Sequence, residues 1–323
     1  MMPVDYNSSI QYSSGSELYT HNWVTLAHHM NRFIPDVLEV LRARTGVDFT
    51  AYRPAMLERR ILGRMSAIHM AGEAEYLEHL LSSTSEPMRL LEKITIKVSR
   101  LYRHAPTFDC LRDTVLPALA NARDGAPLRI WCAGCGTGEE AYTIAMLMEQ
   151  SRIEGSIVAT DIDASALDYA RAGIFPITST VELPPELKKQ YFEPVVERRQ
   201  PQYRAHESLR SRIRFALHDV TSNAEPPGRD AGFDLVSCRN VLIYLQSHAQ
   251  VRVTRRLVEM IRAGGVLCLG EAEWPQAQIA PLLVPLPGKT RLFRVRPGLH
   301  RDEHNPTITP QPLPVTVTQR PPA

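Results

Sequence analysis

The sequence contains no long apolar run. None of its hydrophobic stretches approaches the roughly 20 residues with which a helix spans a bilayer. The N-terminus, MMPVDYNSSIQYSSGSELYT, also lacks the basic start and the apolar core of a secretory signal. We therefore expect a cytoplasmic protein that does not insert into a membrane.

An excess of charge of one sign is also absent. The 37 Lys and Arg residues nearly balance the 35 Asp and Glu residues, which leaves a net charge of +2. Such a balance does not favour nucleic acid as the partner. One local exception lies at residues 49–70, where four arginines accompany a single acid, Glu58. A short charge run of this kind is usually a solvated surface, and a docking face is the alternative. The four arginines are Arg53, Arg59, Arg60 and Arg64.

The sequence lacks a disulfide framework, because its five cysteines are an odd number without the spacing of one. Cys132 and Cys135 form a C-x-x-C pair, which is compatible with redox chemistry or with half of a zinc site. No second pair of ligands follows, and glycines lie among and after the two thiols. We therefore expect no metal centre, and nothing in the sequence indicates an assembly larger than a monomer.

The first third of the chain has a helical pattern. Residues 1–30 are polar, and we interpret them as a flexible tail. Residues 31–95 carry apolar side chains at helical spacing, with Gly46 and Pro54 where one helix ends and the next begins. No segment there resembles a strand. The pattern predicts a small N-terminal helical domain, followed at 96–126 by a linker and a first helix.

Strands and helices alternate from about residue 127 to residue 296. This alternation predicts a doubly wound, mostly parallel α/β sheet. Residues from about 177 to 211 interrupt it with prolines and a possible hairpin, which indicates an inserted β-subdomain. Residues 297–323 are rich in Pro and Thr, and we expect them to be disordered. The candidate strands are 128–132, 156–160, 212–217, 233–238 and 266–270, and the candidate helices are 139–150, 164–172 and 247–262.

Three alternate glycines, Gly134, Gly136 and Gly138, follow the first strand, where a doubly wound sheet binds a nucleotide-like ligand. The spacing is G-x-G-x-G and not the dinucleotide pattern G-x-G-x-x-G. Glu139 and Glu140 then stand where a diphosphate would need bare amide donors. Carboxylates suit a ligand with hydroxyl groups and a positive charge, such as S-adenosylmethionine.

Asp161 supports this interpretation. It ends the second strand, 23 residues beyond Gly138, at about the distance expected for an acidic ligand of a ribose. Two alternatives without a ligand remain for the local pattern. The glycine loop could be a simple packing turn, and Glu139 and Glu140 could only interact favourably with the helix dipole. A nicotinamide-dependent oxidoreductase is the alternative enzyme, and the glycine spacing argues against it.

Several further segments resemble one family. They are RRILGRM (59–65), ITIKVSRLYR (94–103), the glycine loop itself, ATDID (159–163), ARAGIFP (170–176), CRNVLIYL (238–245) and GGVLCLGEAE (264–273). Together they are similar to motifs of the CheR-type methyltransferases, which methylate glutamates of chemotaxis receptors. CRNVLIY after a strand is the most specific of them. The resemblance covers about residues 31–296 and implies a Rossmann-like methyltransferase fold.

The resemblance implies S-adenosylmethionine as the cofactor, S-adenosylhomocysteine as the product, and a role for particular residues. Arg103 and Tyr244 would act at the transfer site, while Arg53, Arg59, Arg60 and Arg64 would contact the helical bundle of a chemotaxis receptor. In some members the inserted β-subdomain also grips a receptor tail peptide. The implied cofactor-binding residues are Lys97, Ser99, Arg103, Gly134, Gly136, Glu140, Asp161, Asp219, Val220, Asn240 and Val241.

The implied reaction is compatible with so few polar residues. A glutamate side chain has an ordinary pKa of about 4.3 and is an ionised nucleophile at neutral pH. Displacement from a sulfonium has a neutral leaving group, so neither a metal nor a general base is required. Arg103 could hold the carboxylate through two hydrogen bonds, and Tyr244 could orient it. From the local pattern alone, Arg103 could equally be a surface residue, Asn240 a turn residue and Tyr244 a core aromatic.

Several positions depart from the family pattern, among them Leu101 and Tyr102, which stand in place of two phenylalanines. Lys97 stands in place of an asparagine, Ser99 in place of a threonine, and Asp219 in place of an asparagine. Lys97 adds a cation near a sulfonium ligand, which is unfavourable, and Asp219 could partly offset it. A second hypothesis follows from these changes: a family member with weak or no catalysis that acts as a cofactor-binding scaffold or sensor in signalling.

Overall fold

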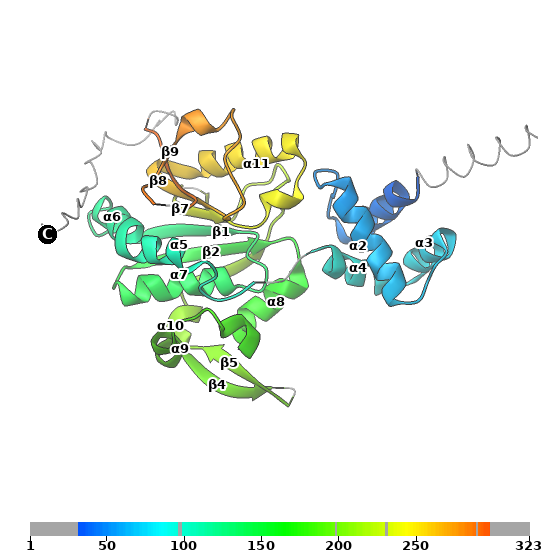
Figure 1. Ribbon diagram of the computed structural model, residues 1–323, viewed down its shortest axis with the longest axis horizontal. Helices are drawn as coiled ribbons and strands as arrows, with labels where there is room; N and C mark the ends of the chain where they lie inside the picture. Colours follow the sequence, from blue (N-terminus) through cyan, green and yellow to red (C-terminus); the bar gives the residue numbers. More distant parts are fainter. Residues whose placement is uncertain (1–31, 96–98, 198, 230–231, 289, 298–323) are drawn as a thin grey trace, which may run out of the picture.

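A computed structural model describes residues 32–95, 99–197, 199–229, 232–288 and 290–297 of the chain (Figure 1). The chain has three parts. A group of helices comes first, and a large central sheet with helices on both faces follows it. A small sheet is inserted within the sequence of this second part. Within the described residues, no helix has the length and apolar character that a membrane crossing requires.

The N-terminal part consists of a helix at 32–45 followed by α2 (Pro54–Ala67), α3 (Glu73–Ser82) and α4 (Glu86–Ile94). Pro54 occupies the first turn of α2, where its missing N–H costs no hydrogen bond. The apolar stripe of α2 is buried against the other helices at Leu57, Ile61 and Met65. A predominantly helical region was predicted here.

A short arm at residues 99–104 leads to a helical segment that changes its winding. This segment runs through α5 (Ala105–Cys110), a π-helical turn at Leu111–Val115 and α6 (Leu116–Asn121). Tyr102 and His104 in the arm have left-handed backbone conformations, with φ of 62° and 67°. Such conformations cost free energy in residues other than glycine, so the surrounding contacts must hold the arm in place.

The central sheet has seven strands in the order β6-β2-β1-β7-β8-β10-β9. The five strands from β6 to β8 pair in parallel, and β10 is antiparallel to both of its neighbours. The prediction of a mostly parallel α/β sheet is confirmed. The strands are β1 (Leu128–Ala133), β2 (Gly155–Asp161), β6 (Ile213–Leu217), β7 (Phe233–Cys238), β8 (Ile261–Leu269), β9 (Leu283–Pro285) and β10 (Leu292–Val295).

Helices cover both faces of this sheet. Helix α7 (Glu139–Gln150) packs in one apolar core with α5 and α6, and α11 (Ser247–Met260) belongs to a second core. Figure 1 shows α7 and α11 on opposite sides of the strands. The second core also contains the buried side chains of the N-terminal helices, so these helices share their apolar interior with one face of the sheet. Helix α8 (Ala164–Ala172) follows β2.

The inserted part is a three-stranded antiparallel sheet in the order β3-β5-β4. Its strands are β3 (Ile174–Pro176), β4 (Phe192–Glu197) and β5 (Gln200–Ala205), joined with α9 (Pro185–Tyr191) and followed by α10 (Glu207–Arg210). Strand β4 lies at the free edge of this sheet, at the bottom of Figure 1. A 3-10 turn at Ile177–Thr180 connects β3 back toward the central sheet.

A backbone contact joins the N-terminal helices to the central sheet. Tyr52 and Leu245 form an isolated antiparallel bridge, the Arg53 amide donates to the Tyr244 carbonyl at 2.9 Å, and the Gln246 amide donates to the Ala51 carbonyl at 2.9 Å. The start of α2 is therefore fixed beside the segment that follows β7.

Candidate active site

A pocket of about 200 Å³ opens at the carboxyl ends of β1 and β7, the edge at which doubly wound sheets bind their ligands. It combines the arm, the glycine loop after β1, the start of α7 and the turn after β7. Its lining residues are Ser99, Arg100, Arg103, Gly134, Cys135, Gly136, Glu140, Arg239, Asn240, Ile243 and Tyr244.

The glycine loop is shaped by two different constraints. Gly134 has a φ of +74°, and a Cβ built there would lie 2.4 Å from the Cγ2 of Val241, so neither its conformation nor its space admits a side chain. Gly136 has a φ of +53°, but nothing lies within 4 Å of the corresponding position. Since Gly136 lines the pocket, this open space is available to a ligand that approaches the backbone.

Substitution by alanine should therefore have different effects on stability and on ligand binding at the two glycines. We expect Gly134→Ala to lower the free energy of unfolding by about 2 kcal/mol, from left-handed strain and overlap with Val241. Gly136→Ala should cost only the strain, about 1 kcal/mol, but should weaken cofactor binding about tenfold because its methyl group enters the pocket. Urea denaturation and calorimetry with S-adenosylhomocysteine measure the two effects. If Val241→Ala fails to restore part of the stability of Gly134→Ala, the overlap is not the cause.

Asp161, at the end of β2, braces the glycine loop. Its Oδ2 accepts a hydrogen bond from the Gly136 amide at 2.7 Å, and its Oδ1 accepts one from the Asp163 amide at 3.0 Å. Burial raises the pKa of Asp161, and these amide bonds act against that shift. Asp161 is half-buried, so part of its surface remains accessible next to the loop.

The arm carries Arg103 into the pocket, and two backbone hydrogen bonds just before Arg103 hold the arm in place. The Leu101 amide donates to the Ser179 carbonyl at 2.8 Å, and the Tyr102 amide donates to the Thr143 hydroxyl at 3.0 Å. Leu101 and Tyr102 are themselves buried. The backbone around Arg103 is thus fixed by its neighbours on the arm, and its side chain lines the pocket with Tyr244.

Arg239 is a buried cation at the base of the pocket. Its Nη1 donates to Glu140 Oε2 at 3.2 Å, its Nη2 donates to the Arg103 carbonyl at 3.0 Å, and its guanidinium carbon lies 4.8 Å from the centre of the Phe108 ring. One side chain therefore joins the turn after β7, the first turn of α7 and the arm. The sequence motif CRNVLIY contained Arg239, but the pattern gave no indication of these partners.

The turn after β7 projects Asn240, Ile243 and Tyr244 into the pocket. Asn240 has a left-handed φ of +61°, a conformation that asparagine tolerates better than most residues. Burial raises the pKa of Tyr244, while the charges of Arg60 and Arg103 act in the opposite direction. Tyr244 therefore stays protonated at neutral pH, and its hydroxyl can donate a hydrogen bond.

Other predicted residues lie outside the pocket lining. Asp219 uses its Oδ1 to accept bonds from the Thr221 amide and hydroxyl, both at 2.7 Å, and so closes its own turn. Val220 is buried in the core that contains the N-terminal helices, and Val241 packs against Gly134. Lys97 lies outside the described residues, so its predicted role has no structural counterpart.

Tyr52 was not expected near the site. Burial and then the charges of Asp219 and Asp161 raise its pKa, and its backbone bridge to Leu245 holds it next to the segment that follows β7. No sequence signal could have found it, because the contact depends on how the helices dock on the sheet.

The four arginines of residues 49–70 do not behave as one group. Arg53 and Arg59 are exposed and Arg60 is half-buried, and the pKa of Tyr244 responds to both Arg60 and Arg59. Arg53 also donates its Nε to the Leu245 carbonyl at 3.1 Å. The segment that starts α2 thus brings positive charge toward the pocket.

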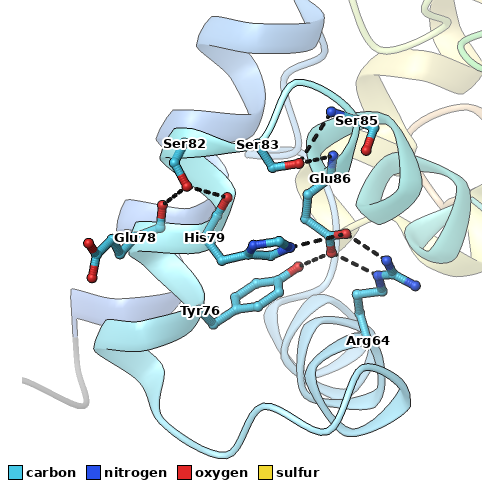
Figure 2. A network of polar contacts seen from close by, with 8 residues as sticks. All are labelled: Arg64, Tyr76, Glu78, His79, Ser82, Ser83, Ser85 and Glu86. Atoms are coloured by element: carbon cyan, nitrogen blue, oxygen red, sulfur yellow. Dashed lines mark hydrogen bonds and ion pairs between the residues drawn. The ribbon is translucent and has the colours of Figure 1, made fainter.

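Arg64 is engaged elsewhere. Its Nε and Nη2 donate to the two carboxylate oxygens of Glu86 at 2.8 and 2.6 Å, as Figure 2 shows. Glu86 is only 1% exposed, and the Tyr76 hydroxyl donates to it at 3.1 Å. Arg64 therefore stabilises the packing of α2, α3 and α4, and contact with a receptor remains a prediction for it.

The buried thiols do not form a reactive pair. Cys132 and Cys135 are free and buried, and burial raises the pKa of both. Among the residues that the structure describes, no group of three or more His, Cys, Asp or Glu side chains is arranged to hold a metal ion.

Comparison with known proteins identifies a family. Residues 97–279 match a family model described as the S-adenosylmethionine-binding domain of CheR methyltransferase, and residues 34–95 match the all-alpha domain of CheR methyltransferase. The first match leaves the nicotinamide alternative without support.

Individual relatives agree with this match. A chemotaxis protein methyltransferase of Listeria monocytogenes is 32% identical over 72% of this chain and 87% of its own length. Chemotaxis protein methyltransferase 2 of Pseudomonas aeruginosa is 30% identical over 76% and 88%, respectively. An uncharacterised 104.1 kDa protein of Rhodobacter capsulatus is 34% identical over 89% of this chain, which spans only 29% of that longer protein.

Proposed function

The chain belongs to the CheR methyltransferase family, and from that premise we propose that it methylates glutamate side chains of methyl-accepting chemotaxis receptors. The products would be glutamate methyl esters and S-adenosylhomocysteine. The observation that carries the proposal is the convergence of Arg103 and Tyr244 with the acidic Glu140 in one pocket.

The pocket fits a cationic nucleoside ligand. Gly136 leaves its backbone accessible, Glu140 offers a carboxylate in the lining, and Asp161 lies directly behind the loop. When bound, S-adenosylmethionine supplies an electrophilic methyl group on a positively charged sulfur. We propose that Ser99, Arg103, Gly134, Gly136, Glu140, Asp161, Asp219, Val220, Asn240 and Val241 hold it. The same role stays a prediction for Lys97, which lies outside the described residues.

The substrate carboxylate needs orientation more than activation. A glutamate is ionised at neutral pH, since its ordinary pKa is about 4.3. The guanidinium of Arg103 can hold one carboxylate through two N–H groups, and the protonated Tyr244 hydroxyl can donate to the same group. Positioning of this kind converts an encounter into an effectively intramolecular step, which can lower a barrier by about 7–11 kcal/mol in well-oriented cases.

Docking of the receptor would occur beside this pocket. Arg53, Arg59 and Arg60 present positive charge next to Tyr244, which suits the acidic surface of a helical bundle that carries the target glutamates. We propose that the protein works as a monomer in the cytoplasm and that the inserted sheet provides a further contact.

Transfer of a labelled methyl group tests the proposal. Membranes that carry methyl-accepting receptors are incubated with the protein and methyl-labelled S-adenosylmethionine, with the same membranes lacking receptors as the control. We expect label on the receptor that is released as methanol by mild base, as for a carboxyl ester. Label that resists base would contradict a glutamate ester. Tight cofactor binding without any labelling would favour the scaffold or sensor role instead.

A further inference from the structure

A buried carboxylate, Glu273, lies just behind the turn that carries Asn240 and Tyr244. It follows β8 and is only 3% exposed. Its Oε2 accepts hydrogen bonds from the Gly270 amide at 2.6 Å and the Asn240 amide at 2.9 Å, and its Oε1 accepts one from the Ile243 amide at 3.2 Å. Two of these three donors belong to the turn after β7.

Burial raises the pKa of Glu273, and the hydrogen bonds from backbone amides act against that shift. Within the described part of the chain, no lysine or arginine forms an ion pair with Glu273, so the amide N–H groups provide its stabilisation. The surroundings are built to fit it: a Cβ at Gly270 would lie 2.6 Å from Glu273 Oε2 and 2.8 Å from the Asn240 amide nitrogen. Gly270 therefore leaves the space through which the carboxylate reaches the turn.

A second side chain holds the carbonyl groups of the same turn. Gln250 on α11 donates its Nε2 to the Leu242 carbonyl at 2.9 Å and to the Leu245 carbonyl at 3.1 Å. The carboxylate of Glu273 thus accepts from backbone N–H groups of residues 240–245, and the side chain of Gln250 donates to backbone carbonyl groups of the same segment. These contacts help to hold Asn240 in its left-handed conformation, with φ of +61°.

We propose that Glu273 is a positioning residue for cofactor binding and methyl transfer, because it fixes the turn from which Asn240, Ile243 and Tyr244 line the pocket. Its role at the transfer step rests on the proposed function, whereas its role in cofactor binding does not. Glu273 itself is not among the pocket-lining residues, so it acts through the turn.

The test compares two buried glutamates in the full chain. Glu273→Gln keeps the shape of the side chain but turns one acceptor oxygen into a donor, so at least one amide of the turn loses its partner. Glu86→Gln is the matched control, because Glu86 is equally buried but lies in the N-terminal helices. Both should lower the melting temperature. Calorimetry with S-adenosylhomocysteine should show the Kd rising about tenfold or more for Glu273→Gln, the factor that corresponds to about 1.4 kcal/mol and lies within the cost of a buried group left without its partner, and less than twofold for Glu86→Gln.

Hydrogen exchange without cofactor gives an independent result. At least one of the amides of residues 240 and 243 should exchange faster in Glu273→Gln, and both should exchange at the wild-type rate in Glu86→Gln. If Glu273→Gln does not fold, Gly270→Ala disturbs the same contact and should weaken binding to a similar extent. An unchanged Kd in the variant at Glu273, or an equal rise in the Glu86 control, would overturn the inference. If wild-type protein binds S-adenosylhomocysteine but methylates no receptor, the proposed function fails and the binding comparison still decides the role of Glu273.

Discussion

Arg103→Ala is expected to slow methyl transfer to the receptor by about 10²–10³-fold while weakening S-adenosylhomocysteine binding by less than about tenfold. The range is that of removing one preorganised donor that stabilises charge at a reaction centre. The asymmetry follows from the proposed role of the guanidinium, which is to hold the substrate carboxylate. Single-turnover transfer of labelled methyl groups and calorimetry measure the two quantities separately.

The arm should survive this substitution. Its backbone is held by the Leu101 and Tyr102 amides and by the bond from Arg239 to the Arg103 carbonyl, none of which requires the Arg103 side chain. Loss of transfer in a folded protein would therefore report on the guanidinium itself.

Two further variants sharpen the comparison. Arg103→Lys retains the charge but loses the planar pair of donors, so it should recover only part of the rate. Arg171→Ala removes an exposed arginine of α8 that pairs with Asp168 at 2.8 Å, and it should transfer at the wild-type rate. An Arg103→Ala variant that transfers as fast as Arg171→Ala would exclude the proposed role.

Some elements were predictable to the residue because their ends carry local signals. Helices α7 and α8 have the bounds expected from the sequence. Gly138 precedes α7 in a left-handed conformation, the Asp163 side chain caps the start of α8 by accepting from the Ala166 amide, and Gly173 ends α8 in a left-handed conformation. Each signal acts within a few residues, so the sequence alone contains it.

Elements that depend on partners distant in the sequence were harder to predict from the sequence. Helix α11 was expected to reach residue 262, but it ends at Met260 because Ile261 already pairs with Phe233 in the sheet. Strands β9 and β10, of three and four residues, were not predicted at all, since such short strands show no clear alternation. Strand β10 pairs with β8 and β9 pairs with β10, and neither pairing is visible in the local pattern.

The same division applies to the pocket. Gly134, Glu140, Asn240 and Tyr244 could be expected to meet because the carboxyl ends of parallel strands share one edge of the sheet. What could not be predicted is which charged side chain faces which partner. The pairing of Arg239 with Glu140, across 99 residues of sequence, and the bonds from Asn240 and Ile243 to Glu273 arise only when the strands are assembled.

Arg64 shows the consequence for a surface prediction. Arg60 and Arg64 are four residues apart and share a helical face, and the family resemblance implied a common docking role for them. The structure gives the two arginines different surroundings. Arg64 binds Glu86, which lies 22 residues further along the chain, whereas the charge of Arg60 acts on Tyr244 at the pocket. Burial alone raises the pKa of Glu86, but the hydrogen bonds and charge of Arg64 outweigh burial and leave that pKa below its ordinary value.

Arg64→Ala should therefore lower the free energy of unfolding by about 3–4 kcal/mol at neutral pH, since it leaves a buried carboxylate without its cation. Urea denaturation measures this loss. The difference from wild type should begin to shrink already above the ordinary glutamate pKa of about 4.3, because burial without the cation raises the pKa of Glu86 in the variant, so the carboxyl becomes protonated there first. The difference should shrink further as the pH falls below that value, because the lowered pKa of Glu86 in the wild type means that the stability from its pair with Arg64 is lost only there. Arg59→Ala, on the exposed side of the same helix, should change stability by less than about 0.5 kcal/mol and yet slow receptor methylation. Equal stability of the two variants would show that the bond from Arg64 to Glu86 contributes nothing to the free energy of unfolding. Contact with the receptor would then be the remaining proposal for Arg64.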